Sequence, residues 1–193
     1  AEDLLVGLTD LARLEQGRLQ PELQAIDVGQ LFEGLRSQFE QLAMNRGLGL
    51  RFRPCRHTVR SDARLLRRIL QNFIANALRY TASGRVLVLA RRRGAQIELQ
   101  VWDTGPGIPS ARQATMFSDL PSAGGSSPWG ERGLGIGLSG CRRMADALGH
   151  PLGLRSRPGR GSCFSVTVPR WHGRSIEPGA SAEVTTTTAV GRI

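Results

Sequence analysis

Hydrophobic residues recur at helical spacing in several parts of the chain. Residues 1–16 place Leu4, Leu8 and Leu11 on one face, and Gly17 follows them. This pattern predicts an amphipathic helix that ends at the glycine. A face this apolar favours a partner helix, as in a dimer.

Two further helices are expected downstream. Asp27 can cap the first, which should end at Gly47. Its buried side is predicted to consist of four residues, Val28, Leu31, Leu35 and Leu42. Ser61 or Asp62 can cap the second, a long helix that should run to about Tyr80.

Alternating apolar and polar residues predict strands in much of the remaining chain. The predicted strands are 48–53, 86–90, 97–103, 152–156 and 162–168, the last four forming two hairpins. The mixture of helices and hairpins indicates a single domain that contains both α-helices and β-strands.

Two segments lack this periodicity. Between residues 109 and 135 glycine, serine and proline accumulate, ahead of a helix expected at 136–148. A loop of that length inside a compact domain is typically either a mobile lid or disordered, and a functional lid is favoured here. Residues 171–193 include a run of four threonines and are predicted to be a flexible tail.

Composition narrows the classes of function. The 193 residues, 40% of them hydrophobic, suffice for one compact domain with short appendages. We find neither a run of about 18 to 20 apolar residues nor a signal peptide, so a cytoplasmic domain is expected. The three scattered cysteines predict neither a disulfide framework nor a zinc site.

The net charge of +10 comes entirely from arginine, because the sequence contains no lysine. A basic chain raises the question of a nucleic-acid partner. The arginines are dispersed, however, with few aromatic residues among them, which favours solvated faces, so no nucleic-acid partner is expected. Absence of lysine also excludes a P-loop and Schiff-base chemistry.

The long predicted helix carries two asparagines four residues apart. Asn72 and Asn76 therefore lie on one face, at the flank of the apolar stripe, with Arg79 and Tyr80 one turn further on. An unpaired buried amide costs about 1–3 kcal/mol. Either a polar ligand or polar groups of neighbouring loops should meet these side chains.

A carboxylate and a glycine-rich helix start complete the candidate chemistry. Asp103 shares the parity of the apolar residues in its strand and so points inward, where it would accept a ligand amino group or cap its own turn. The amides from Gly133 to Gly137 would suit a phosphate, although a plain flexible loop is the alternative. The GxGxxG match at 135–140 lacks the preceding strand of a dinucleotide site.

The order of these motifs resembles that of bacterial sensor histidine kinases. QNFIANALRYT at 71–81 is similar to their N box and DTGPGI at 103–108 to their G1 box. Phe117 with Leu120 looks like a weakened F box, GLGIGL at 133–138 is similar to the G2 box, and LARLEQG at 11–17 to the end of a dimerisation helix.

The resemblance implies an α/β fold, the two-layer Bergerat ATP-binding fold of the GHKL superfamily, with a mixed β-sheet beneath helices. It divides the chain into the end of the dimerisation and phosphoacceptor hairpin (1–20), an ATP-binding catalytic domain (21–170) and a flexible tail or linker (171–193). The same fold occurs in DNA gyrase and the Hsp90 chaperone.

The resemblance also implies a function. Such a domain binds ATP and Mg²⁺ and transfers the γ-phosphate to a histidine, here outside the chain on the dimerisation domain of the same protein. The phosphate would then pass to a response regulator. The parent protein is expected to form a homodimer and could be anchored in the inner membrane.

Site residues follow from the same motifs. Asn76 would ligate Mg²⁺, Asn72 would sit beside the phosphates, and Arg79 would help to neutralise them. The residues implied to bind ATP are Tyr80, Asp103, Gly105, Gly107, Ile108, Phe117, Gly133, Leu134, Gly135, Ile136, Gly137 and Leu138.

Two features concern the reaction itself. Hydrolysing members of the superfamily carry a glutamate as general base where Asn72 stands, and an amide cannot accept a proton, so phosphotransfer is favoured over hydrolysis. The three histidines, His57, His150 and His172, lack the context of a phosphoacceptor and are interpreted as structural or incidental.

Other classes of function remain as hypotheses. A scaffold of the same fold with a degenerate nucleotide site would act through dimerisation alone, and Leu120 in place of a second phenylalanine favours it. Intact Asn76, Asp103 and glycines favour the kinase. A serine kinase of the anti-sigma-factor type, or a basic nucleic-acid-binding protein, fits less well with the dimerisation-helix resemblance at 11–17.

Overall fold

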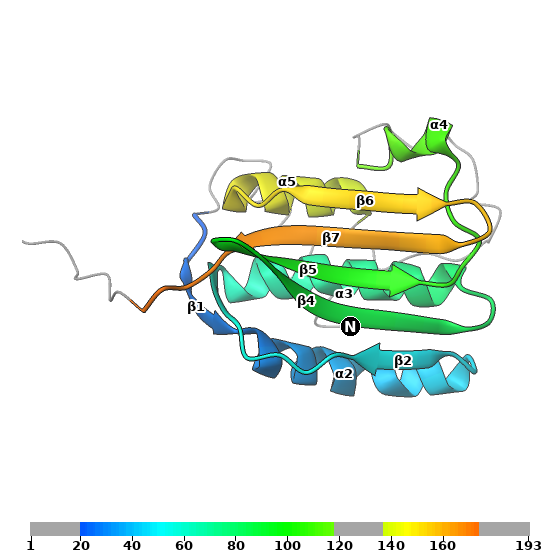
Figure 1. Ribbon diagram of the computed structural model, residues 1–193, viewed down its shortest axis with the longest axis horizontal. Helices are drawn as coiled ribbons and strands as arrows, with labels where there is room; N and C mark the ends of the chain where they lie inside the picture. The colour runs from blue at the N-terminus through cyan, green and yellow to red at the C-terminus, as the bar shows by residue number, and fades with distance from the viewer. Residues whose placement is uncertain (1–19, 118–136, 174–193) are drawn as a thin grey trace, which may run out of the picture.

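A computed structural model describes residues 20–117 and 137–173 of the chain (Figure 1). The predicted helix at 1–16, most of the predicted lid and nearly all of the predicted tail lie outside these residues. No helix in the two described ranges is long and apolar enough to cross a membrane.

A five-stranded mixed sheet forms one layer. Its strands, in spatial order, are β2 (Gly49–Phe52), β4 (Arg85–Arg93), β5 (Gln96–Asp103), β7 (Gly161–Pro169) and β6 (Leu152–Arg157). β2 runs parallel to β4, and the other neighbours are antiparallel. The two predicted hairpins are confirmed as β4–β5 and β6–β7.

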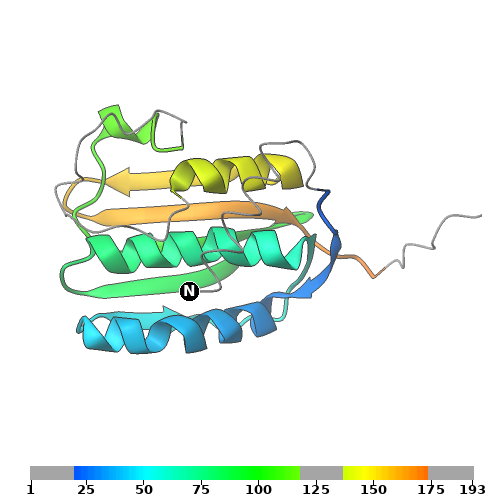
Figure 2. The same ribbon diagram turned by 180° about the vertical axis from the view of Figure 1, so that it is seen from behind.

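Three helices form the second layer, all on the same face of the sheet (Figures 1 and 2). They are α2 (Val28–Asn45), α3 (Ala63–Tyr80) and α5 (Leu138–Leu148). A single turn, α4 (Ser110–Gln113), lies beside the outer edge of β6, next to the C-terminal end of that strand (Figure 1). The predicted two-layer α/β fold with a mixed sheet is therefore confirmed.

Both long helices begin where the sequence predicts. The Asp27 carboxylate accepts the Gln30 amide at 3.1 Å at the start of α2. Asp62, rather than Ser61, caps α3, and one of its oxygens accepts the Leu65 amide at 3.1 Å. These bonds satisfy backbone donors that the first helical turn cannot pair internally.

The predicted buried side of α2 is wrong at one position. Leu42 is 45% exposed, whereas Phe39 and Ala43 are buried. From Leu35 onward the buried stripe advances in steps of four residues, so Leu42 is turned by about 100° from the stripe's last member.

A second, two-stranded sheet was not predicted. β1 (Gln24–Asp27) pairs antiparallel with β3 (Thr58–Ser61). The Trp171 amide donates to the Thr58 carbonyl oxygen at 2.9 Å, just after the end of β7. The entry and the exit of the described domain are therefore joined at one end (Figure 1).

The core lies between the main sheet and the helices. Phe73 of α3 is fully buried, and its ring centroid lies 5.5 Å from that of Phe164 in β7. His150 is 4% exposed, and its Nε2 lies 2.8 Å from the hydroxyl of buried Ser61. This position fits the structural interpretation of that histidine.

Candidate functional site

The two asparagines of α3 contact each other. Nδ2 of Asn76 donates to Oδ1 of Asn72 at 2.9 Å. Asn72 is 9% exposed, while Asn76 is half-buried and faces a cavity. The amide nitrogen of Asn76 thus has a partner in Asn72. Its Oδ1 accepts no hydrogen bond from the described residues, so this oxygen is available to a ligand.

Asp103 ends β5 with its carboxylate on the helix side of the sheet. Oδ1 accepts the backbone amides of Gly105 at 2.8 Å and Ser162 at 3.3 Å. Burial raises the pKa of Asp103, and these two hydrogen bonds oppose the rise only in part. Within residues 20–117 and 137–173 the second oxygen, Oδ2, has no donor, so it can accept one from a ligand.

The turn after Asp103 requires glycine for close packing. A Cβ on Gly105 would lie 2.9 Å from Oδ1 of Asp103. Gly107 has φ +71°, and a Cβ there would lie 2.1 Å from the Arg157 carbonyl oxygen. Side chains at these positions would displace the carboxylate or the β6–β7 turn.

These groups surround one cavity of about 260 Å³. It lies between the C-terminal half of α3, the end of β5 and the start of α5. Six residues implied by the motifs line it: Asn76, Tyr80, Asp103, Gly107, Ile108 and Leu138. The structure thus brings together residues that are up to 62 positions apart in the sequence.

Other motif residues are placed around the cavity rather than on its wall. Asn72 and Gly105 hold Asn76 and Asp103 in place, as described above. Phe117 packs edge-on against Phe164 with ring centroids 6.1 Å apart. The Arg79 guanidinium lies 5.7 Å from the ring centroid of Tyr80, whose side chain is 46% exposed.

The glycine-rich motif is only partly described. Gly137 is the N-cap residue of α5 and makes no side-chain hydrogen bond there. Gly133, Leu134, Gly135 and Ile136 lie outside the described residues. The implied phosphate contacts of those four residues therefore stay predictions.

Some polar residues near the cavity were not singled out from the sequence. Arg112 and Ser162 line it. Thr81 ends α3, and its buried Oγ1 has no hydrogen-bond partner among the described residues. A Cβ on Gly105 would lie 3.3 Å from that hydroxyl, so it is close to the Asp103 carboxylate. The threonine that closes the N-box segment is the one signal that could have revealed Thr81.

Comparison with known proteins explains this arrangement. The sequence profile of a family described as histidine kinase-, DNA gyrase B-, and HSP90-like ATPase matches residues 61–172. That range contains every residue lining the cavity. The chain belongs to this ATPase family.

Sensor kinases are among the relatives within this family. The adaptive-response sensory kinase SasA of Parasynechococcus marenigrum (strain WH8102) is 39% identical over 124 residues, which cover 62% of this chain and 31% of SasA. The chain therefore spans about a third of the length of the curated relatives it matches. The resemblance to sensor histidine kinases is confirmed.

Solved structures of this ATPase family share the fold. Full-length ShkA in complex with AMPPNP matches with a TM-score of 0.71 at 27% identity, over 90% of this chain and 36% of ShkA. The histidine kinase ThkA in complex with the response regulator TrrA matches with a TM-score of 0.65 at 19% identity, over 88% of this chain and 49% of ThkA. The Bergerat fold implied by the motifs is confirmed.

Proposed function

We propose that this chain is the catalytic part of a protein histidine kinase that binds ATP with Mg²⁺ in the 260 Å³ cavity. The γ-phosphate is transferred to a histidine outside the chain, on the dimerisation domain of its own homodimeric protein, and then to a response regulator. The observation that carries the proposal is that Asn76 and Asp103 line the same cavity, each with an oxygen that no described group pairs.

Asp103 provides the base-recognition end of the cavity. Its Oδ1 is fixed by the Gly105 and Ser162 amides. The remaining oxygen can accept a hydrogen bond from the exocyclic amino group of adenine. A buried carboxylate is destabilised when it lacks hydrogen-bond donors. A hydrogen bond from this amino group would therefore offset part of the desolvation cost of Asp103.

Asn76 provides the phosphate end. Mg²⁺ prefers oxygen ligands and usually keeps one or two protein ligands beside substrate phosphates. The free Oδ1 of Asn76 fits that preference, and the described residues contain no cluster of three His, Cys, Asp or Glu side chains that could hold a metal. When bound, Mg²⁺ would neutralise phosphate charge. Asn72 holds Asn76 in this orientation, and Arg79 lies one turn away.

The lining favours transfer over hydrolysis. Among the described residues that line the cavity, Asp103 is the only carboxylate, and Gly105 and Ser162 already hold it. Asn72, next to Asn76, cannot accept a proton from water. Activation of a water molecule near the phosphates thus has no described base.

Solved relatives support the proposed partners. The ShkA structure contains AMPPNP, and the ThkA structure contains the response regulator TrrA. The division into 1–20, 21–170 and 171–193, a cytoplasmic location, and a parent protein anchored in the inner membrane also remain proposals. Buried His150, half-buried His57 and exposed His172 all lack the helical context of a phosphoacceptor.

Calorimetric titration with AMPPNP, with and without Mg²⁺, tests the nucleotide site. Asp103→Asn should weaken binding by about tenfold or more, because a hydrogen bond to a charged group is lost. Asp146→Asn is the matched control, since Asp146 is an exposed residue of α5 whose ion-pair partner in the described part of the chain is Arg142. Equal losses in both variants, or no binding by the unchanged chain, would contradict the proposal.

Asn76→Ala in the full-length protein separates the kinase from the scaffold hypothesis. Loss of phosphotransfer and of the Mg²⁺ dependence of AMPPNP binding supports the kinase. Unchanged signalling by that variant supports a scaffold that acts through dimerisation alone.

A further inference from the structure

The strand β6 forms one edge of the main sheet (Figure 1). Its only strand partner among the described residues is β7. The Thr167 amide donates to the Pro151 carbonyl oxygen at 2.9 Å. This bond shows which opposite residues of β6 and β7 form hydrogen-bonded pairs in this antiparallel ladder. Because hydrogen-bonded pairs alternate along such a ladder, the backbone groups of Leu154 and Ser156 point away from β7.

A hydrogen bond at the edge of β6 is consistent with the outward direction of the Ser156 backbone groups. Nε2 of Gln113, on α4, donates to the Ser156 carbonyl oxygen at 3.2 Å. An amide side chain therefore already occupies one edge acceptor, next to the end of the strand. The Leu154 N–H and C=O groups have no such partner in the described residues.

A second cavity, of about 550 Å³, follows this edge. It is lined by four consecutive residues of β6, from Leu154 to Arg157, and also by Gln113. Successive side chains of a strand point to opposite faces. Residues from both faces of β6 therefore line this cavity, which extends past the backbone edge of the strand and also reaches Trp102 of β5.

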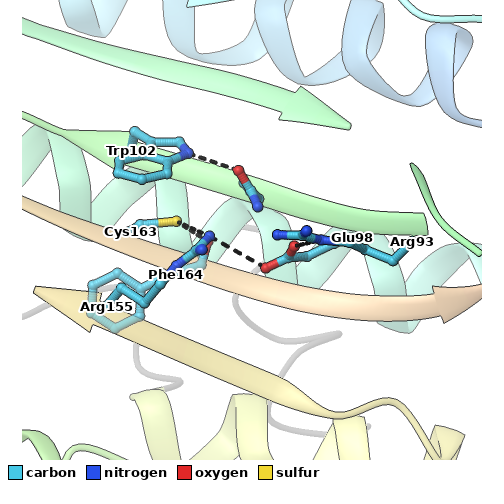
Figure 3. Close-up of polar contacts among 7 residues, drawn as sticks. Arg93, Glu98, Trp102, Arg155, Cys163 and Phe164 are labelled. Atoms are coloured by element: carbon cyan, nitrogen blue, oxygen red, sulfur yellow. Dashed lines mark hydrogen bonds and ion pairs between the residues drawn. The ribbon is translucent and has the colours of Figure 1, made fainter. Parts of the chain in front are cut away.

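The lining of this edge cavity is strongly basic. Arg155, Arg157 and Arg160 line it, and no described carboxylate does. Arg155 is paired with Glu98 at 3.4 Å, whereas Arg157 and Arg160 have no ion-pair partner within the described ranges. The Arg155 guanidinium also lies 5.4 Å from the ring centroid of Trp102, which is 39% exposed (Figure 3).

We propose that β6 binds an extended acidic segment of a partner protein, which adds to the sheet as a further strand that pairs with both backbone groups of Leu154 and with the Ser156 N–H. Backbone hydrogen bonds along an exposed edge supply affinity in this mode of recognition, and side chains supply specificity. Carboxylates of the segment pair with Arg157 and Arg160, whose guanidinium groups match them in shape and charge.

Other occupants fit this edge less well. A second copy of the chain would bring the same arginines of both copies together across the new ladder, which is repulsive. A single-stranded nucleic acid has no peptide backbone to pair with the edge, and it binds by stacking on several aromatic rings. Among the residues lining the edge cavity, Trp102 is the one aromatic residue.

The test uses the 193-residue chain and a synthetic peptide of alternating Glu and Thr residues, within the usual length of a strand. The peptide should bind and should slow hydrogen exchange of the Leu154 and Ser156 amides, measured by NMR. The same peptide with Gln in place of Glu should bind at least about tenfold more weakly, because the charge-assisted bonds are lost.

Two double variants of equal charge give the matched comparison. Arg157→Gln with Arg160→Gln should weaken peptide binding by about tenfold or more. Arg91→Gln with Arg92→Gln, at the far end of β4, removes the same charge and should change it less than about twofold. Circular dichroism confirms that both variants are folded.

Several results would overturn the proposal. Equal weakening in the two double variants would mean that net charge alone attracts the peptide. Binding without protection of the Leu154 and Ser156 amides would exclude strand addition. Tighter binding of a single-stranded oligonucleotide, with protection of the same amides, would identify a nucleic-acid site instead.

Discussion

The two faces of the main sheet bury their residues in different ways. On the face under the helices, Leu99 and Val101 are fully buried by apolar side chains. On the other face, which no described helix covers, Gln100, Cys163 and Ser165 are 2%, 1% and 5% exposed. Burial at these positions of β5 and β7 is nearly complete on both faces, although only one face has an apolar layer above it.

Long polar side chains cover the open face. The indole of Trp102 donates to Oε1 of Gln100 at 2.9 Å, and Arg155 lies over the indole ring and 3.7 Å from the sulfur of Cys163 (Figure 3). Burial on this face therefore depends on charges and hydrogen bonds, whose net contribution to folding is smaller than that of apolar burial. The faces should respond differently to substitution.

Phe73→Ala should give the largest effect. It removes a fully buried ring that packs on Phe164, and such truncations cost about 3–5 kcal/mol through lost burial and a residual cavity. Trp102→Ala removes a larger ring from the open face but should cost less than about 2 kcal/mol, because that side chain is 39% exposed. Urea unfolding followed by circular dichroism measures both. Equal losses would mean that the open face is as stabilising as the covered one.

Glu98→Gln tests the ion pairs of the open face. Burial alone would raise the pKa of Glu98, but the hydrogen bond from Arg93 and the charge of Arg155 outweigh it, so this pKa lies below its ordinary value of 4.5. A depressed carboxyl pKa contributes stability above pH 4.5 that is lost as pH falls through the folded-state value. The variant should lose about 1 kcal/mol at neutral pH.

Its control is Glu33→Gln on α2. Glu33 is 61% exposed and pairs with Arg36, so that variant should lose less than about 0.5 kcal/mol. Below pH 4.5 the Glu98→Gln protein should also show a flatter decline in stability than the unchanged chain. A parallel decline in both proteins would show that Glu98 does not contribute to acid unfolding.

Much of the covered face could be predicted from the sequence. The Asp27 cap, the end of α3 near Tyr80 and the inward parity of Asp103 all depend on residues within one or two turns or on strand alternation. Local rules of this kind do not require knowledge of the fold. The motif order then indicated that Asn76 and Asp103 would share a cavity.

The remaining features depend on long-range pairing. β1 and β3 are four-residue strands whose partners lie more than thirty positions apart, and neither shows a clear alternation of its own. Ser162 reaches the nucleotide cavity because the register places it opposite Asp103. Arg112 reaches it from a single helical turn inside a segment that composition alone predicted to be a loop.

A smaller effect should appear only when pH changes. Burial lowers the pKa of His150 below its ordinary value of 6.5, and the backbone of Gly149 opposes this only in part. The unfolded chain therefore takes up a proton first, so stability is lost as pH falls from about 6.5 toward the folded-state value. This window begins at a higher pH than that of Glu98, so on acidification the loss of stability due to His150 should come before the loss due to Glu98.

His150→Phe should abolish the loss of stability that begins as pH falls below about 6.5, while leaving the pH dependence below 4.5 intact. Urea unfolding at a series of pH values measures it. Ser61→Ala is the comparison, because it removes the 2.8 Å partner of Nε2 and keeps the titrating ring. A pH dependence that persists in the phenylalanine variant would assign this window to another group.

The last contrast concerns the hydrogen bond within the open face. Trp102→Phe keeps an aromatic ring beneath Arg155 but removes the donor to Oε1 of Gln100, and Gln100 is nearly fully buried. The loss should be about 1–2 kcal/mol, because one buried acceptor is left unpaired. Urea unfolding of the single and double variants measures it.

Adding Gln100→Leu to Trp102→Phe should recover much of that loss. With both partners apolar, no buried polar atom lacks its bond, and such paired replacements are often nearly neutral. Recovery would mean that the hydrogen bond between Gln100 and Trp102 positions the indole and Arg155 rather than stabilising the fold. If the double variant is instead less stable than either single variant, the hydrogen bond between Gln100 and Trp102 stabilises the fold directly. The two faces of the sheet would then differ less in stability than their composition indicates.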